Sequence, residues 1–155
     1  METACEVRER ICCMNDKIKI RKCTLDDVYQ LALLNKQLID DEKSHNSMNV
    51  NELEERMHEF ITTEYDAYYF INKENVVGYA LVKNTCNPLY LRQFLIEREY
   101  RMMHYGTSAF RCLMKHLNVD SIDIEVLPWN EPGIRFWESL GFHEVSRYMR
   151  FKRSI

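Results

Sequence analysis

Hydrophobic and polar residues alternate along this chain with two different periods, one of two residues, typical of strands, and one near 3.6, typical of helices. Residues 17–22 alternate basic residues with isoleucine, which predicts a half-buried strand. Thr24 and Asp27 then form a helix capping box, followed by apolar residues at helical spacing, Val28, Leu31, Leu34 and Leu38. The polar stretch 40–49 predicts a loop, and residues 51–63 predict a second helix.

The middle of the chain is richer in aromatic and β-branched residues. Residues 67–82 predict a hairpin around a polar turn at 73–75, and residues 89–96 predict a third strand. The next stretch, 97–105, is too polar to remain in a sheet, and residues 108–117 return to a helical pattern.

The last part of the chain predicts a strand, a helix and another strand. Residues 122–126 alternate isoleucine or valine with acids, which predicts the first of these strands. Pro132 suits the first turn of a helix, Gly141 follows its end, and residues 142–151 predict the final strand. This order predicts an α/β fold with one mixed sheet covered by helices.

The length and composition indicate one ordinary domain. We assign residues 17–155 to it and residues 1–16 to an N-terminal extension, because the extension has no hydrophobic period. No stretch approaches the roughly 20 apolar residues of a membrane span, and the N-terminus does not resemble a secretory signal. We therefore expect a cytoplasmic protein that does not bind membranes.

Charge and cysteine content exclude further classes. The net charge is −3 and the basic residues are scattered, so the sequence has no pattern for binding nucleic acid. The six cysteines have neither CxxC nor Cys/His ligand spacing. We expect free thiols and no metal site.

We expect a functional site where the strand at 89–96 leads through a loop into the helix at 108–117. The first N–H groups of a helix lack internal partners and the helix dipole favours an anion there. A loop that gathers such amides can hold a pyrophosphate. The alternative is an ordinary strand-to-helix connection.

Two motifs resemble the GNAT superfamily of N-acetyltransferases. Residues 100–110, YRMMHYGTSAF, resemble its motif A, Gln/Arg-x-x-Gly-x-Gly/Ala: Arg101 is at the first position, Gly106 at the last, and His104 at the usual first glycine. Residues 130–142, NEPGIRFWESLGF, resemble Asn-x-x-Ala-x-x-Leu-Tyr-x-x-x-Gly-Phe. The positions in register are Asn130, Gly133, Phe136, Trp137, Gly141 and Phe142.

The resemblance covers about residues 18–151 and implies the acyl-CoA N-acyltransferase fold, with a single mixed, mostly antiparallel central sheet, a splayed pair of parallel strands and flanking helices. It also implies acetyl-CoA as cofactor. In the family the pantetheine arm lies between the splayed strands and the pyrophosphate on the loop amides. The cofactor-binding residues implied here are Phe94, Leu95, Ile96, Arg101, Met102, Met103, His104, Tyr105, Gly106, Thr107, Asn130, Gly133, Phe136 and Trp137.

Each of these assignments has a structural alternative. Phe94 and Ile96 could be core residues, since only one face of a strand can serve a ligand. His104 could contact phosphates, or could be a substitution tolerated in a left-handed backbone conformation.

Direct acetyl transfer needs a base for the amine and a proton for the departing thiolate. Glu125 has the same offset from the second motif as the base of enzymes similar to ribosomal-protein alanine N-acetyltransferases, although strand alternation alone would also expose it. The family's usual acid is a tyrosine, and Trp137 stands there; an indole cannot donate a proton in practice. Tyr105 is a weak candidate acid, with Tyr148 as another.

The acceptor is the least specified part. Asp40, Asp41 and Glu42 lie between the first two predicted helices, a region that often borders the acceptor site in the family. These acids, Asp41 and Glu42 in particular, could attract a cationic amine, or could belong to a solvated loop. We expect a small-molecule or peptide amine as acceptor, and a homodimer is among the assemblies that the sequence allows.

Three functions remain open at this point. The first is an N-acetyltransferase that moves an acetyl group from acetyl-CoA directly to a primary amine. The second, motivated by Trp137 and His104, is a non-catalytic acyl-CoA-binding or regulatory module. The third is an interaction domain that kept the fold and lost the ligand.

Overall fold

The computed structural model describes residues 18–101 and 103–154. The chain forms two compact units, one ending at Glu125 and the other beginning at Val126. The predicted extension at 1–16 and the predicted site residue Met102 lie outside the described residues.

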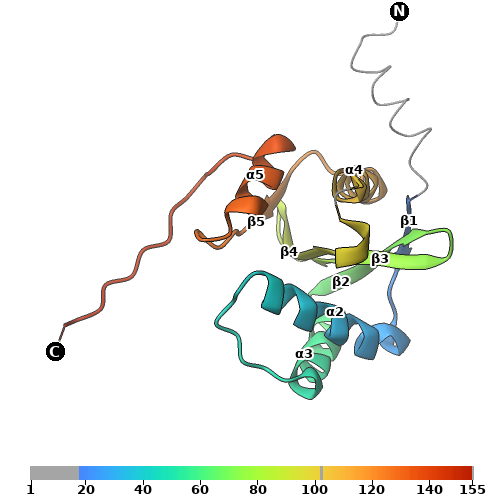
Figure 1. The fold of residues 1–155 in the computed structure, drawn as a ribbon, viewed down its shortest axis with the longest axis horizontal. Helices are drawn as coiled ribbons and strands as arrows, with labels where there is room; N and C mark the ends of the chain where they lie inside the picture. The colour runs from blue at the N-terminus through green and yellow to red at the C-terminus, as the bar shows by residue number, and fades with distance from the viewer. Residues whose placement is uncertain (1–17, 102, 155) are drawn as a thin grey trace, which may run out of the picture. The chain divides into compact units, whose positions relative to one another are not determined.

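The first unit is built on one five-stranded sheet in the order β1-β2-β3-β4-β5 (Figure 1). The neighbours from β1 to β4 pair antiparallel, and β4 and β5 pair parallel. The strands are β1 (Ile18–Lys22), β2 (Tyr65–Asn72), β3 (Asn75–Lys83), β4 (Leu89–Ile96) and β5 (Ile122–Ile124). A mixed, mostly antiparallel sheet with a parallel pair is thus confirmed.

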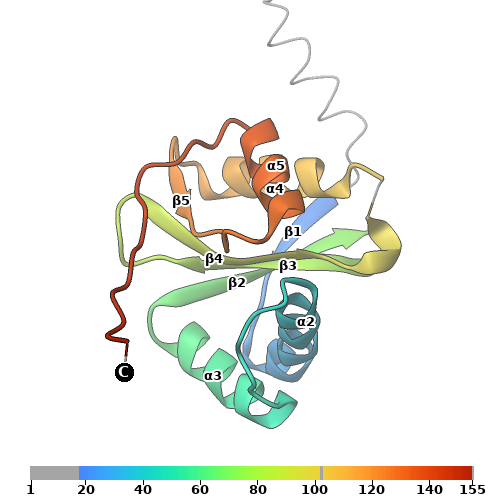
Figure 2. The same cartoon turned by 60° about the vertical axis from the view of Figure 1, so that its left-hand side comes forward.

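Helices cover both faces of this sheet (Figure 2). A short 3-10 turn, η1 (Leu25–Asp27), leads into α2, and another, η2 (Arg98–Tyr100), follows β4. The helices of the first unit are α2 (Val28–Asp41), α3 (Val50–Thr62) and α4 (Tyr105–Leu117). In both views α2 and α3 lie on one side of the sheet and α4 on the other.

Local side chains start the first two helices. Thr24 and Asp27 form the predicted capping box, in which the Thr24 N–H donates to the Asp27 carboxylate at 2.8 Å. The sequence interpretation missed a second box at α3, where the Glu52 N–H donates to the Asn49 side chain at 2.9 Å. The signal was present, because Asn49 and Glu52 have the required spacing.

The core under α2 and α3 explains the hydrophobic pattern. Side chains that α2 and α3 direct at the sheet pack against alternate residues of β2, β3 and β4. The buried residues of this cluster are Cys23, Val28, Leu31, Leu34, Leu38, Met57, Tyr65, Ala67, Tyr69, Tyr79, Leu81 and Leu95. On the other face, Tyr68 contacts His116 of α4 edge-on, with ring centroids 5.4 Å apart.

A bulge in β4 coincides with its separation from β5. The pairing of β3 with β4 passes from Leu81–Gln93 to Val82–Leu91, which leaves Arg92 as an extra residue. The last β4–β5 pair is Leu91–Ile124, so residues 92–96 continue β4 without β5 beside them. Since a bulge bends its strand and increases the local twist, we attribute the separation to Arg92. The predicted splayed pair is therefore present.

Several predicted boundaries in the first unit were wrong. The loop predicted at 40–49 begins later, because α2 includes Asp40 and Asp41, and Asp40 pairs with Lys36 one turn earlier at 3.4 Å. Helix α4 begins at Tyr105, three residues before the predicted start at Ser108. Strand β5 ends at Ile124, two residues earlier than predicted.

The second unit consists of α5 (Glu131–Ser139) and an extended C-terminal segment. Asn130 caps α5 by accepting the Gly133 N–H at 3.2 Å, and Gly141 ends the helical segment with a φ of +101°. The strand predicted at 142–151 was wrong: residues 142–154 contain no strand. Its apolar residues Val145 and Phe151 are 78% and 89% exposed. Alternation is not sufficient for a strand without a paired neighbour.

No helix among the described residues has both the length and the apolar character required to span a membrane.

Gly78 permits the close approach of β3 to β4. A Cβ atom at this position would lie 2.0 Å from the carbonyl oxygen of Leu95, a backbone atom that cannot rotate away. We expect Gly78→Ala to lower the free energy of unfolding by about 2–4 kcal/mol. Thermal unfolding followed by circular dichroism measures this change.

Ala80→Gly, on the same strand, is the control and should cost only about 1 kcal/mol. Equal unfolding temperatures for the two variants would contradict the steric argument.

Candidate active site

The loop after β4 turns through a left-handed residue before α4 begins. His104, the N-cap of α4, has φ 61° and ψ 15° and makes no side-chain capping hydrogen bond. Histidine is enriched among the non-glycine residues that adopt this conformation. The position therefore keeps the backbone geometry usual for glycine, as expected for a tolerated substitution.

The start of α4 has the properties of an anion site. Ser108 is the first residue of the helix whose N–H bonds back to His104, at 3.3 Å. The amides of Tyr105, Gly106 and Thr107 precede it and lie in the turn where a helix offers unpaired N–H groups. No acidic residue occupies this turn, so the positive end of the dipole is not neutralised by a side chain of α4.

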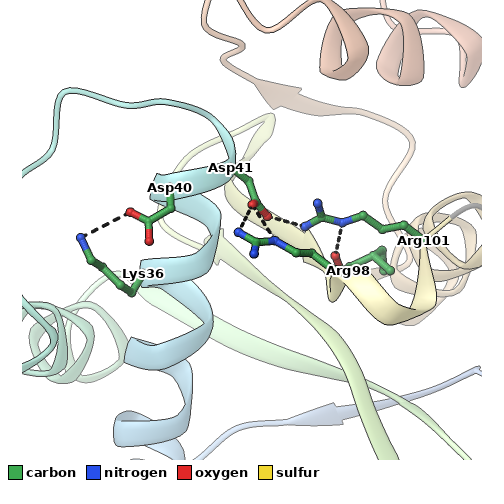
Figure 3. A network of polar contacts seen from close by, with 6 residues as sticks. Lys36, Asp40, Asp41, Arg98 and Arg101 are labelled. Carbon is green, nitrogen blue, oxygen red and sulfur yellow. Dashed lines mark hydrogen bonds and ion pairs between the residues drawn. The ribbon is translucent and has the colours of Figure 1, made fainter.

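Asp41, at the C-terminal end of α2, holds the loop between β4 and α4 in place (Figure 3). Its carboxylate, at the last position of α2, accepts from Nη2 of Arg101 at 2.6 Å and from Nε of Arg98 at 3.0 Å. Arg101 also donates from Nε to the Ile96 carbonyl at 2.7 Å. Two arginines from the loop thus converge on one carboxylate, and one of them also ties the loop to the end of β4.

The electrostatics agree with this ion-pair network. Partial burial by itself would raise the pKa of Asp41, but the hydrogen bonds and charges of Arg101 and Arg98 lower it. The Asp41 side chain is only 17% exposed, compared with 55% for Asp40. Asp41 is therefore an ionised anchor.

These contacts change two sequence interpretations. Asp41, predicted on the acceptor side, has its carboxylate occupied by two guanidinium groups. The Arg101 amide, predicted to bind pyrophosphate, donates to the Arg98 carbonyl at 3.2 Å. Arg101 and Asp41 thus hold the loop in place. The amides that remain for the proposed anion site are those that follow Arg101 in the sequence. Glu42 is partly buried, and burial together with the Asp41 charge raises its pKa.

The edge of β4 beyond the bulge contains the residues predicted for pantetheine. Leu95 is 2% exposed and belongs to the core under α2 and α3. Phe94 is partly buried and packs on Phe70, with ring centroids 5.3 Å apart. Ile96 is buried and its carbonyl accepts from Arg101. Core packing explains why these three side chains are buried or partly buried. What β4 can offer a ligand here is therefore its backbone.

Glu125 follows the last paired residue of β5, at the point where β4 and β5 separate. It is exposed, and its charge acts on the Tyr90 hydroxyl of β4. Burial, followed by the charge of Glu125, raises the pKa of Tyr90 to about 12. Tyr90 therefore stays protonated at neutral pH, as a neutral hydroxyl near the carboxylate.

Sequence reasoning missed Tyr90. Its relation to Glu125 depends on the parallel register, in which Tyr90 is opposite Asp123. A hydroxyl two positions away across a strand pair leaves no local signal in the sequence.

The candidate acids are placed differently. The Tyr105 hydroxyl accepts from Nδ2 of Asn72 on β2 at 2.6 Å, two strands from β4. This contact favours a structural role for Tyr105. Tyr148, in the second unit, is 86% exposed.

The remaining predicted cofactor residues belong to the second unit or to the loop. Asn130 and Gly133 form the cap of α5, where a Cβ at Gly133 would lie 2.4 Å from the Asn130 amide nitrogen. Phe136 and Trp137 stack edge-on at 4.9 Å. Met103 is 61% exposed in the loop.

A family profile described as the acetyltransferase (GNAT) family matches residues 26–142, most of the chain. This chain belongs to the GNAT acetyltransferase family. The match includes strands β2 to β5, the loop before α4 and α5, so the family resemblance of the two motifs is confirmed, as is the prediction of an acyltransferase.

Solved structures share the fold. A possible acetyltransferase from Clostridium difficile 630 is 16% identical with a TM-score of 0.73, covering 90% of this chain and 99% of its own. An aminoglycoside N-acetyltransferase in complex with CoA is 14% identical with a TM-score of 0.66, covering 89% and 95%. A predicted acetyltransferase with acetyl-CoA from Clostridium acetobutylicum is 14% identical with a TM-score of 0.65, covering 87% and 96%.

Among the described residues, no group of three or more histidine, cysteine, aspartate or glutamate side chains is arranged to hold a metal ion. Among the described residues, Cys23, Cys86 and Cys112 form no disulfide, and Cys23 is buried.

The Asp41 anchor gives a pH-dependent prediction. Its folded pKa is lowered, so its stabilisation is present above the unfolded value of about 3.9 and is lost as the pH falls through the lower folded value. We expect Asp41→Asn to reduce the free energy of unfolding at pH 7 by about 1–2 kcal/mol, with the difference from wild type shrinking below about pH 4. Denaturant unfolding across this pH range measures it.

Asp40→Asn is the matched control, since Asp40 is the adjacent, more exposed acid and its ion pair among the described residues is with Lys36, on the same helix. The anchor assignment fails if the two variants lose the same stability at pH 7.

Proposed function

We propose that this protein is an N-acetyltransferase that moves an acetyl group from acetyl-CoA directly to a primary amine of a small molecule or peptide. The observation that carries the proposal is the separation of β4 from β5 immediately before the amides at the start of α4. An unpaired strand edge and a helix N-terminus on one continuous segment suit a ligand with an amide-containing arm and a pyrophosphate.

The residues of this segment fit coenzyme A. The backbone of residues 94–96 would hold the pantetheine arm by strand-like hydrogen bonds. The amides of Tyr105, Gly106 and Thr107 would hold the pyrophosphate. CoA and acetyl-CoA in the two structures with the same fold support this choice of cofactor.

Glu125 is the base in this proposal. Acetyl-CoA, when bound, supplies a thioester whose C–S bond breaks as the C–N bond to the acceptor forms. The carboxylate of Glu125, near the Tyr90 hydroxyl, would take the proton that the acceptor ammonium must lose before it attacks, directly or through one water. The nitrogen loses a second proton as the amide forms, and water would carry a proton to the departing thiolate, which a leaving group with a thiol-like pKa tolerates.

Thr107 tests the cofactor site. Thr107→Asp places a negative charge at the third position of α4, where it suits the helix dipole but repels a pyrophosphate. We expect acetyl-CoA to bind at least about tenfold more weakly, as measured by isothermal titration calorimetry.

Asparagine has the shape of aspartate without its charge, so Thr107→Asn should bind acetyl-CoA nearly as the wild type does. If the wild-type protein binds no acetyl-CoA at high micromolar concentration, the proposed cofactor is wrong.

Glu125 tests the chemistry. We expect Glu125→Gln to lower kcat/KM by about 10²–10⁴-fold, because the amide cannot accept the proton, while the affinity for acetyl-CoA stays unchanged. A thiol-release assay over a broad panel of amines gives the rate, and calorimetry gives the affinity.

Asp123→Asn is the control, since Asp123, on β5 two residues before Glu125, is also an exposed acid. Cofactor binding without turnover of any amine would favour the non-catalytic module instead.

A further inference from the structure

Two arginines on the α2 and α3 side of the sheet, one from α3 and one from β4, lie over the same aromatic ring. The guanidinium carbon of Arg56, on α3, lies 5.3 Å from the centroid of the Phe60 ring, and that of Arg92, at the β4 bulge, lies 5.0 Å from the same centroid. Each contact is favourable by itself, but the two like charges repel each other across the ring.

No ion pair between described residues, within 4.0 Å, involves Arg56 or Arg92. Arg21, Arg98 and Arg101, in contrast, each pair with an aspartate. The charges of Glu42 and Arg56 both act on the Tyr79 hydroxyl. Among the described residues, therefore, no carboxylate is in ion-pair contact with either arginine.

Arg56 is held in place at a cost. Its Nη2 donates to the buried Asn35 side chain at 2.9 Å, but its buried Nε has no hydrogen-bond partner among the described residues. Burial, followed by the charge of Arg92, lowers the pKa of Arg56. Unpartnered buried donors are rare in folded proteins. An anion beside the pair would offset the repulsion and part of this desolvation.

The pair lies on the same side of the sheet as the proposed base. Arg92 donates to the Tyr65 hydroxyl at 3.4 Å, and its neighbour Gln93 accepts from the Tyr79 hydroxyl at 2.9 Å, so the bulge turns both side chains toward this face. The charges of Glu125 and Arg92 both act on the Tyr90 hydroxyl. A base and a basic pair thus flank one tyrosine.

We propose that the acceptor carries a carboxylate in addition to its amine, as an amino acid or related compound does, and that this carboxylate binds at Arg92 and Arg56 while the amine lies at Glu125. This inference rests on the proposed function. A carboxylate matches the planar fork of a guanidinium, and the exposed side chain of Arg92 gives the ligand its point of entry. The Tyr65 hydroxyl offers a further hydrogen-bonding group.

Matched acceptors test the inference. We would compare α-, β- and ω-amino acids with their carboxamides in the thiol-release assay at saturating acetyl-CoA. We expect at least one acid to exceed its amide by about tenfold or more in kcat/KM, mainly through KM. In Arg92→Gln this preference should fall to near one.

Arg21→Gln is the matched control variant. Arg21, on β1, also lies over an aromatic ring, that of Tyr69 at 5.0 Å, but it pairs with Asp27 of η1. Its substitution should leave the acid preference intact. Arg56→Gln is the second test variant, with its unfolding temperature measured because Arg56 is half-buried. If amides serve as well as acids, or if Arg92→Gln leaves the preference unchanged, the inference is wrong while the proposed function stands.

Direct binding separates this inference from the proposed function. If no amine is turned over, calorimetry of the same acids and amides with the CoA-saturated protein decides the question. Binding of an acid that is lost in Arg92→Gln supports the carboxylate site even without catalysis. Equal binding of acid and amide, or no binding of either, overturns it.

Discussion

The separation of β4 from β5 is the constraint on which the rest of the site depends. The strands pair only from Leu89–Ile122 to Leu91–Ile124, and the extra residue Arg92 follows directly. The bend leaves a backbone edge without a neighbouring strand, places Glu125 where the strands part, and directs Arg92 and Gln93 to one face of the sheet. One inserted residue therefore arranges the proposed cofactor edge, base and acceptor side together.

The arginines of the first unit illustrate how ion pairing distinguishes support from recognition. Arg98 and Arg101 are neutralised by Asp41, which ties the end of α2 to the loop before α4 and leaves the α4 amides as the anion site. Arg56 and Arg92 form no ion pair among the described residues and share a ring instead. Because these loop arginines neutralise Asp41, its charge is not available to attract the proposed acceptor. This favours an acceptor with a negative group of its own.

Local patterns predicted the elements well where one face of each was buried in the same core. The hairpin at β2 and β3, the bounds of β4 and the capping box at Thr24 all followed from nearby residues. The predicted strand at 142–151 was wrong because pairing with a neighbour, rather than alternation, makes a strand. Residue 41 was assigned to a loop because its partners, Arg98 and Arg101, are distant in the sequence. Asp40 pairs with Lys36 one turn earlier, a local signal that the sequence interpretation missed.

By itself the sequence determined the mixed sheet, the loop before α4 and the position of Glu125, because each depends on short-range periodicity or on a motif with fixed spacing. Only the tertiary structure decided what the charged side chains do. Interactions between separate elements decide it: Asp41 pairs with two loop arginines, the charge of Glu125 acts on Tyr90, and Arg56 and Arg92 lie over one ring. Electrostatic interactions act through space, so residues far apart in the chain fix the chemistry at each charge.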